Sequence, residues 1–292
     1  MSNPSYAYYP GCSLHASAGE YDLSTRELFA ALGVKLTEIP DWFCCGATPA
    51  HNVDELLSLS LCAKNFELAE QVGGDVAVAC AACFSRLKFT QHTLEANETK
   101  RVQVEKALDA PLKIDRTVKH LLEILVRDYG LQRLSEKVSR PLSGLKVACY
   151  YGCLLTRPPD VPNLDCVEAP TIMEDLIEAA GGTPVEWTHR MECCGANFTL
   201  SRPGVVLQLS NNILKSAKDA GADCILVACP LCHGNLDIRQ KEIENTHSTD
   251  YGLPVLYVTQ LVGLACGLTP DKLGLEALIV NPMPLLKKKG LL

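Results

Sequence analysis

The hydrophobic pattern alternates between short apolar runs, typical of buried strands, and longer segments with apolar residues at helical spacing. In the first half it predicts strands over 6–9, 34–39 and 75–79, and helices over 20–32, 53–72 and from about residue 81. In the second half it predicts strands over 145–150, 183–187 and 223–228, and helices over 172–180, 204–220 and after residue 231. This alternation predicts an α/β fold with mainly parallel sheets.

A charged segment with few turn residues, about 98–140, lies between these two series of elements. We interpret it as helices that complete the first half and lead into the second. The predicted domains are therefore 1–140 and 141–292. We expect two Rossmann-like halves, internally duplicated and related by a pseudo-twofold axis.

The cysteines repeat with the same order in both halves: one cysteine, a Cys-Cys-Gly triplet, and a Cys-x-x-Cys pair. In each half, 34 residues separate the triplet's second cysteine from the Cys-x-x-Cys, and a shift of 149 positions superimposes these two motifs. The shift is 141 for the first cysteine, so the second half has eight extra residues after Cys153. The flanks also match, as in Val78-Ala79-Cys80 and Val227-Ala228-Cys229, which indicates an internal duplication.

Composition narrows the possible functions. A net charge of −7 over 292 residues argues against nucleic-acid binding. No segment resembles a signal peptide and no run of about 20 apolar residues could span a membrane, so we expect a cytoplasmic protein. Fifteen cysteines, an odd number, in a reducing compartment favour metal binding over a disulfide framework.

Each half offers five thiols, and the ends of parallel strands would gather them at one edge of a sheet. The two sets are Cys12, Cys44, Cys45, Cys80 and Cys83, and Cys153, Cys193, Cys194, Cys229 and Cys232. Each Cys-x-x-Cys begins a predicted helix, whose free N–H groups favour thiolate. The glycine after each vicinal pair permits a tight turn that directs both thiols to one site.

Three kinds of site remain open on this evidence. A vicinal disulfide would be strained and in the wrong compartment. Structural zinc takes four ligands and would leave one thiol unused. An iron–sulfur cluster matches the all-sulfur set best, although ordinary cubanes also use four cysteines.

The spacing Cys-x31-Cys-Cys-x34-Cys-x-x-Cys, in which glycine is the first of the 34 residues and x31 becomes x39 in the second copy, resembles the cysteine-rich CCG family. Two complete copies at this length resemble the B subunits of heterodisulfide reductases. The resemblance implies one non-cubane [4Fe–4S] cluster in each set of cysteines. It further implies reduction of the coenzyme M–coenzyme B heterodisulfide in methane formation, with a ferredoxin-like C subunit and an electron-bifurcating, flavin-containing A subunit as partners.

The chain has no G-x-G-x-x-G after a predicted strand, so we expect electrons to come from a partner. One alternative is an iron–sulfur relay subunit of a lactate, glycolate or glycerol-3-phosphate oxidation system. The other is a scaffold held together by zinc, without enzymatic activity.

The substrate implied by the resemblance carries anionic groups, which arginine, lysine, histidine or N–H donors would bind. The candidates near the motifs are His51, Arg202, His15, Arg157 and His233, together with Arg86 and Asn235. His51 and Arg202 are favoured, because each follows a vicinal pair in corresponding stretches. The remaining cysteines are expected to be small buried residues: Cys62, Cys149, Cys166, Cys224 and Cys266.

Overall fold

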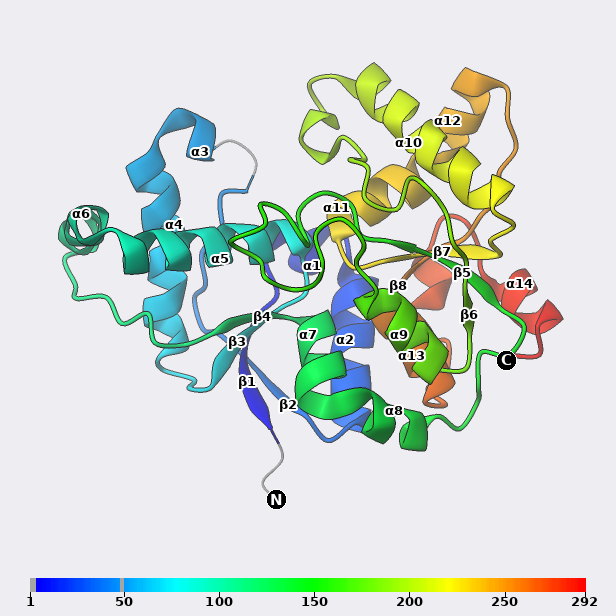
Figure 1. The fold of residues 1–292 in the computed structure, drawn as a ribbon, viewed down its shortest axis with the longest axis horizontal. Coiled ribbons are helices and arrows are strands. Elements are labelled where there is room, and N and C mark those ends of the chain that lie inside the picture. Colours follow the sequence, from blue (N-terminus) through cyan, green and yellow to red (C-terminus); the bar gives the residue numbers. More distant parts are fainter. Residues whose placement is uncertain (1–3, 48–49) are drawn as a thin grey trace.

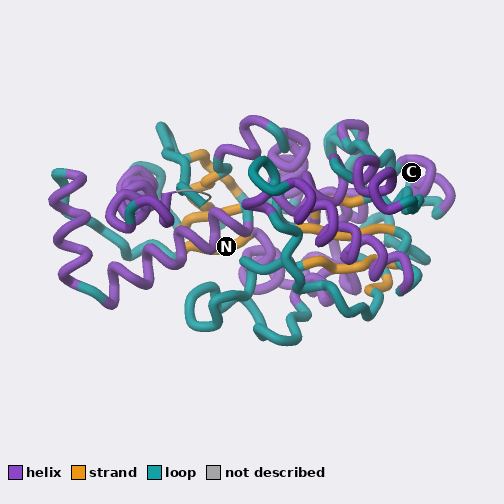
Figure 2. The backbone as a smooth tube through the Cα atoms, turned by 90° about the horizontal axis from the view of Figure 1, so that it is seen from above, coloured by secondary structure: helices purple, strands orange, loops and turns teal. Residues whose placement is uncertain are grey.

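The computed structural model describes residues 4–47 and 50–292. It contains two four-stranded sheets with the equivalent strand orders β2-β1-β3-β4 and β6-β5-β7-β8. Every pairing in both sheets is parallel. The two sheets lie side by side along the length of the molecule (Figures 1 and 2). The predicted α/β fold with two duplicated halves is therefore confirmed.

The first half begins with strand β1 and ends with helix α8. Its elements are β1 (Ser5–Tyr9), α1 (Cys12–Ala16), α2 (Gly19–Ala31), β2 (Lys35–Glu38), α3 (Ala50–Val53), α4 (Glu55–Ala69), β3 (Asp75–Val78), α5 (Ala81–Ala96), α6 (Glu98–Leu108), β4 (Val118–His120), α7 (Leu121–Glu123), a π-helical segment (Ile124–Gly130) and α8 (Leu131–Lys137).

The second half follows the same plan. Its elements are β5 (Lys146–Tyr150), α9 (Ile172–Ala179), β6 (Thr183–Pro184), a 3-10 turn (Ala196–Phe198), α10 (Pro203–Asp219), β7 (Cys224–Val227), α11 (Pro230–His233), a π-helical segment (Gly234–Ile238), α12 (Gln240–His247), β8 (Val255–Tyr257), α13 (Val258–Ala265), a 3-10 turn (Leu275–Ala277) and α14 (Met283–Lys288).

The interpretation of 98–140 as helices is wrong in one respect, because strand β4 also lies inside this segment and pairs with β3. Only three residues of β4 pair, so its apolar pattern is too short to read from sequence. The strand expected over 183–187 is also shorter, since only Thr183 and Pro184 pair with β5. A domain boundary near residue 140 remains our proposal, as α8 ends at Lys137 and β5 begins at Lys146.

Helices α2 and α13, one from each half, pack against each other between the two sheets (Figure 1). A single cluster of buried apolar side chains extends from Tyr6 in the first half to Leu291 near the C-terminus. Because the halves share this core, the carboxyl ends of the strands in both sheets are held in a fixed relation to each other.

Candidate functional site

All ten motif cysteines lie beyond the carboxyl ends of strands or in the loops that join them. Cys12 begins α1 soon after β1, Cys80 immediately precedes α5 after β3, and Cys229 immediately precedes α11 after β7. Each Cys-x-x-Cys thus lies at the start of a helix, as predicted. All fifteen cysteines belong to the described residues, and each is a free thiol.

The sulfurs approach one another in the same pairs in both halves. The first cysteine pairs with the first of the vicinal pair, and the second of the vicinal pair pairs with the last of the Cys-x-x-Cys. The Sγ–Sγ distances are 4.0 Å for Cys12–Cys44, 3.2 Å for Cys45–Cys83, 3.7 Å for Cys153–Cys193 and 3.7 Å for Cys194–Cys232. The duplicated sequence therefore builds a duplicated constellation of thiols.

The remaining cysteine of each set lies where the halves meet. The thiols of Cys80 and Cys229, one from each half, lie close enough to shift each other's pKa, with that of Cys80 raised and that of Cys229 lowered. Both are buried, whereas Cys12, Cys44 and Cys193 are exposed. The ten sulfurs thus form one continuous group, buried at its centre and open to solvent on its outer parts.

The pair distances suit metal binding. Two thiolates on one tetrahedral ion with bonds of about 2.3 Å lie about 3.8 Å apart. Three of the four pairs, at 3.7 to 4.0 Å, match this value. Within the described residues no three Cys, His, Asp or Glu side chains converge on one ion position. The closest sulfur contacts are therefore pairs, at separations that thiolates bound to one metal ion adopt.

Two glycines leave room beside these sulfurs. A Cβ on Gly11 would lie 3.0 Å from the Cys83 sulfur, and one on Gly152 would lie 3.2 Å from the Cys232 sulfur. Both glycines also have positive φ angles, which disfavour other residues. Any side chain at these two equivalent positions would enter the space that a cluster needs.

The first cysteine of each vicinal pair has thiolate character. A hydrogen bond from Cys153 lowers the pKa of Cys193 to about 6, and the backbone N–H of Gly195 contributes. In the first half, the hydrogen bond from Cys12 lowers the pKa of Cys44 in the same way. Thiolate is the form that binds metal.

The turn predicted after each vicinal pair is confirmed, since Gly46 and Gly195 have φ angles of 66° and 83°. A tyrosine at the end of a strand also holds each vicinal pair from the other side. The hydroxyl of Tyr9 donates to the carbonyl of Phe43 at 2.8 Å, immediately before Cys44. These contacts fix the backbone of the loop that carries the exposed thiol.

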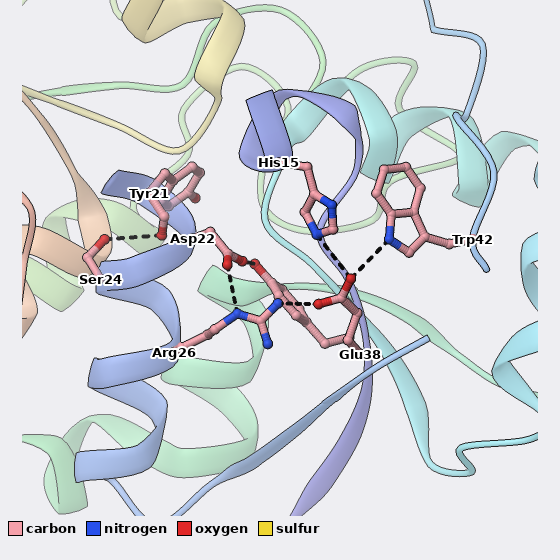
Figure 3. A network of polar contacts seen from close by, with 8 residues as sticks. His15, Tyr21, Asp22, Ser24, Arg26, Glu38 and Trp42 are labelled. Atoms are coloured by element: carbon pink, nitrogen blue, oxygen red, sulfur yellow. Dashed lines mark hydrogen bonds and ion pairs between the residues drawn. The ribbon is translucent and has the colours of Figure 1, made fainter. Parts of the chain in front are cut away.

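Glu38, at the end of β2, connects α1, α2 and the loop that carries Trp42 (Figure 3). Its carboxylate accepts hydrogen bonds from Arg26 of α2 at 2.5 Å and from Trp42 at 3.2 Å, and pairs with His15 of α1 at 3.0 Å. The ring of His15 also meets Trp42 edge-on. His15, predicted to bind substrate, thus lies beside the site with one ring nitrogen committed to Glu38.

His51 and Arg202 are exposed, in α3 and just before α10, each a few residues beyond a vicinal pair as expected. The guanidinium of Arg157 lies 3.9 Å from the carboxylate of Glu168 and is partly exposed. His233 does not fit the predicted substrate role, because it is buried and its Nε2 bonds to the Val255 carbonyl. Its place inside α11 turns the ring toward β8 rather than toward solvent.

The side chains of the other two candidates also form hydrogen bonds within the protein. Arg86 donates to the hydroxyl of Ser58 at 2.5 Å. Asn235 is buried and donates to Cys194, to its carbonyl at 3.2 Å and to its sulfur at 3.5 Å. Asn235 therefore holds a motif cysteine in place, a role that was not predicted from the sequence.

Among the cysteines outside the motifs, Cys62, Cys149 and Cys224 are fully buried, as expected. Cys266 is partly buried. The prediction for Cys166 is wrong, because this residue is exposed in the long loop that follows Cys153. The extra residues of the second half form this loop, which contains no regular element that would cover the side chain.

The sequence analysis did not single out His120, Tyr21 and Tyr150, which hydrogen-bond to the backbone carbonyl immediately before a motif cysteine. Tyr150 bonds to the carbonyl of Glu192, and His120 and Tyr21 both bond to that of Ala79. The repeated tyrosine three residues before Cys12 and Cys153 was a usable signal for Tyr150. No sequence signal marks His120 or Tyr21, whose contacts cross between the halves. In the described residues, no helix has both the length and the apolar character needed to span a membrane.

Comparisons with known proteins agree with this geometry. The model of the CCG cysteine-rich domain matches twice, over residues 6–88 and 147–237. A Wolinella succinogenes protein named 8-methylmenaquinol:fumarate reductase membrane anchor subunit is 33% identical, covering 94% of this chain and 97% of the relative. The B subunit of a ferredoxin/F420H2-dependent CoB–CoM heterodisulfide reductase from Methanosarcina acetivorans is 31% identical, covering 96% and 95%.

The crystal structure of a hypothetical protein from Helicobacter pylori has a similar fold, with a TM-score of 0.76 at 13% identity. The match covers 96% of this chain but only 54% of that one, so this chain spans about half its length. Clustered cysteines in two CCG copies indicate an iron–sulfur protein with a redox role. With two matched copies and relatives at 31–33% identity over nearly its whole length, the chain belongs to the CCG cysteine-rich family that includes the B subunits of heterodisulfide reductases.

Proposed function

We propose that this chain is the disulfide-reducing subunit of a cytoplasmic heterodisulfide reductase complex. Its substrate would be the coenzyme M–coenzyme B heterodisulfide, and each set of five cysteines would hold one non-cubane [4Fe–4S] cluster. The observation that carries the proposal is the duplicated arrangement of sulfur pairs, because it gives one chain two equivalent sets of thiols. The inner thiols of the two sets, Cys80 and Cys229, lie close enough to shift each other's pKa. Relatives named as heterodisulfide reductase subunits support the substrate class.

Cleavage of a disulfide to two thiols consumes two electrons and two protons. When bound, the two clusters would supply one electron each, so neither sulfur need be left half-reduced. The chain holds the two sites together through the buried cysteines and exposes Cys12, Cys44 and Cys193 on the outside. A disulfide would approach from this exposed side, while the buried side excludes water.

Anionic groups of the substrate would bind basic side chains around the exposed thiols. His51 and Arg202 are the favoured ligands, with Arg157 and the free nitrogen of His15 as further candidates. A separate recess of about 410 Å³ lies near the second set, lined by Ser17 of the first half and by Asn235 and Arg239 of the second, and none of these four candidates is among its lining residues. A ligand in this recess would contact both halves.

Electrons would come from a ferredoxin-like C subunit, supplied in turn by a flavin-containing, bifurcating A subunit. This assignment of partners rests on two points: the sequence has no G-x-G-x-x-G motif after a predicted strand, and several relatives are named as subunits of larger reductases. One Methanosarcina acetivorans relative is named as ferredoxin/F420H2-dependent, and another is named as the D subunit of a dihydromethanophenazine-linked reductase. These names support membership of a multisubunit reductase.

A second candidate is an electron-relay subunit that binds no disulfide. It is favoured by the 33% identity to the Wolinella succinogenes protein, which is named as part of a fumarate reductase. A relay in a hydroxy-acid oxidation system would be of the same kind. In both cases the clusters would pass electrons without contacting a substrate.

The test is iron, sulfide and zinc analysis of protein purified without oxygen, followed by EPR after adding the heterodisulfide. We expect about eight irons per chain, as two [4Fe–4S] clusters require, and a new substrate-dependent signal. The same iron content with no response to the heterodisulfide would favour the relay function. Zinc without iron would contradict both.

A further inference from the structure

Two fully buried polar side chains, Tyr21 and His120, converge on one backbone carbonyl between the halves. The hydroxyl of Tyr21 donates to the carbonyl of Ala79 at 2.9 Å. Nε2 of His120 lies 3.0 Å from the same oxygen. Both side chains are completely shielded from solvent, and neither takes part in the proposed binding of clusters.

The protonation of His120 follows from its contacts. The backbone N–H of Leu122 donates to Nδ1 at 3.2 Å, so the ring proton must be on Nε2. This N–H therefore donates to the carbonyl of Ala79, and the ring also lies close enough to the backbone carbonyl of Ala228 for that carbonyl to affect its pKa. One imidazole thus contacts both halves of the molecule.

The two carbonyls have equivalent places in the repeat. Ala79 immediately precedes Cys80 and Ala228 immediately precedes Cys229, so both carbonyls belong to the turns that begin the Cys-x-x-Cys motifs. The histidine itself is not duplicated, because the corresponding end of β8 carries Tyr257. A single bridge therefore serves two sites.

Tyr21 is held by the opposite half. Its ring stacks on Tyr257 with centroids 4.0 Å apart and planes 7° from parallel. One turn further along α2, the hydroxyl of Ser24 contacts that of Thr259 in α13 at 2.7 Å. Tyr21 therefore connects the Ala79 carbonyl to an element of the second half.

We propose that His120 and Tyr21 are positioning residues that set the separation and orientation of the two cluster sites. The proposal rests on the proposed function, in which both sites act on one disulfide. The two sulfurs of a disulfide are about 2.05 Å apart, so both sites must reach neighbouring atoms at the same time. A small shift of one Cys-x-x-Cys turn would prevent this even with both clusters intact.

The test compares H120F, H120Q and Y21F with the wild-type complex, purified without oxygen with its partner subunits. Y6F is the matched control. Tyr6, near the start of β1, is also a buried tyrosine of the first half, but its hydroxyl bonds to Asp128 at 2.7 Å. The measurements are iron content, the magnetic interaction between the two clusters in EPR, and kcat and KM for the heterodisulfide.

We expect H120F to keep its iron but to change the magnetic interaction and to lower kcat by about 100-fold, the typical cost of misplacement by about 1 Å. Y21F should show the same changes to a smaller extent, H120Q should recover part of the wild-type behaviour, and Y6F should match the wild type. If H120F fails to fold, Y21F carries the test, since it removes a single oxygen atom.

Wild-type magnetic interaction and kcat in both H120F and Y21F would overturn the inference. A wild-type complex that does not reduce the heterodisulfide would contradict the proposed function alone, because the EPR comparison needs only two clusters. A wild-type chain with a single cluster would overturn both.

Discussion

The hydroxyl of Tyr150 donates a 2.6 Å hydrogen bond to the backbone carbonyl of Glu192, the residue before the vicinal pair of the second half. Tyr9 makes the equivalent bond to Phe43 in the first half. Each tyrosine stands three residues before the first cysteine of its set. The same contact thus ties the first cysteine of each set to the loop that carries the vicinal pair.

We therefore expect Y150F to destabilise the protein by about 1 kcal/mol, the usual contribution of one hydrogen bond. It should also release iron to a chelator faster than the wild type, because the loop that carries Cys193 is no longer held. Y251F is the control, since Tyr251 bonds to Asn211 in the same half, at the side chain's Oδ1. Equal rates of iron release from the two variants would contradict this role.

Asn235 gives the second set a hydrogen bond to sulfur, from its side-chain amide to Cys194 at 3.5 Å. Such bonds stabilise the reduced form of an iron–sulfur cluster and raise its reduction potential. We expect N235L to lower one of the two reduction potentials and to leave the other unchanged, measured by redox titration followed by EPR. N211L, a buried asparagine of the same half, should change neither.

Replacing one exposed motif cysteine should reduce metal binding in its own set of cysteines and leave the other set unchanged. We expect C193S to lose about half of the bound iron, because a missing ligand weakens metal binding in its own set. C166S is the matched control, as Cys166 is also exposed in the second half but lies outside the motifs. Full iron content in C193S, or an equal loss in C166S, would contradict the assignment of ligands.

Arg202 is expected to bind an anionic group of the substrate. R202A should raise KM about fivefold, which corresponds to about 1 kcal/mol for an exposed ion pair. The effect should weaken at high ionic strength, because salt screens exposed charges. R133A, at an exposed arginine of α8, is the control, and an unchanged KM in R202A would remove this residue from the site.

Because His120 is buried, the free energy of unfolding should decrease as the pH falls. Burial lowers the pKa of its imidazole to about 4, against 6.5 for an ordinary histidine. The unfolded chain therefore binds this proton more readily, so the stabilisation is complete above about pH 6.5 and is lost as the pH falls toward 4. The full difference is about 3 kcal/mol.

The measurement is the urea midpoint of the wild type and of H120Q between pH 7.5 and pH 5. The wild type should lose more stability than H120Q over this range, so the difference between them should shrink as the pH falls. H92Q, at an exposed histidine, should follow the wild type. Parallel curves for the wild type and H120Q would show that His120 is not the titrating group.

The sequence alone was sufficient to predict the repeated α/β plan and the grouping of the motif cysteines into two sets. Both depend on local signals: apolar periodicity within each segment, and cysteine spacing that is read directly from the chain. The turns at Gly46 and Gly195 were predictable for the same reason, because a positive φ is a local requirement.

Other features depend on contacts between segments that are distant in the chain. Strand β4 exists because three residues pair with β3, and His233 is buried because α11 turns it toward β8. The proximity of Cys80 to Cys229, and that of the His120 ring to the Ala228 carbonyl, both cross between the halves. Only packing brings these residues together, since hydrogen bonds and burial over such separations leave no periodic trace in the sequence.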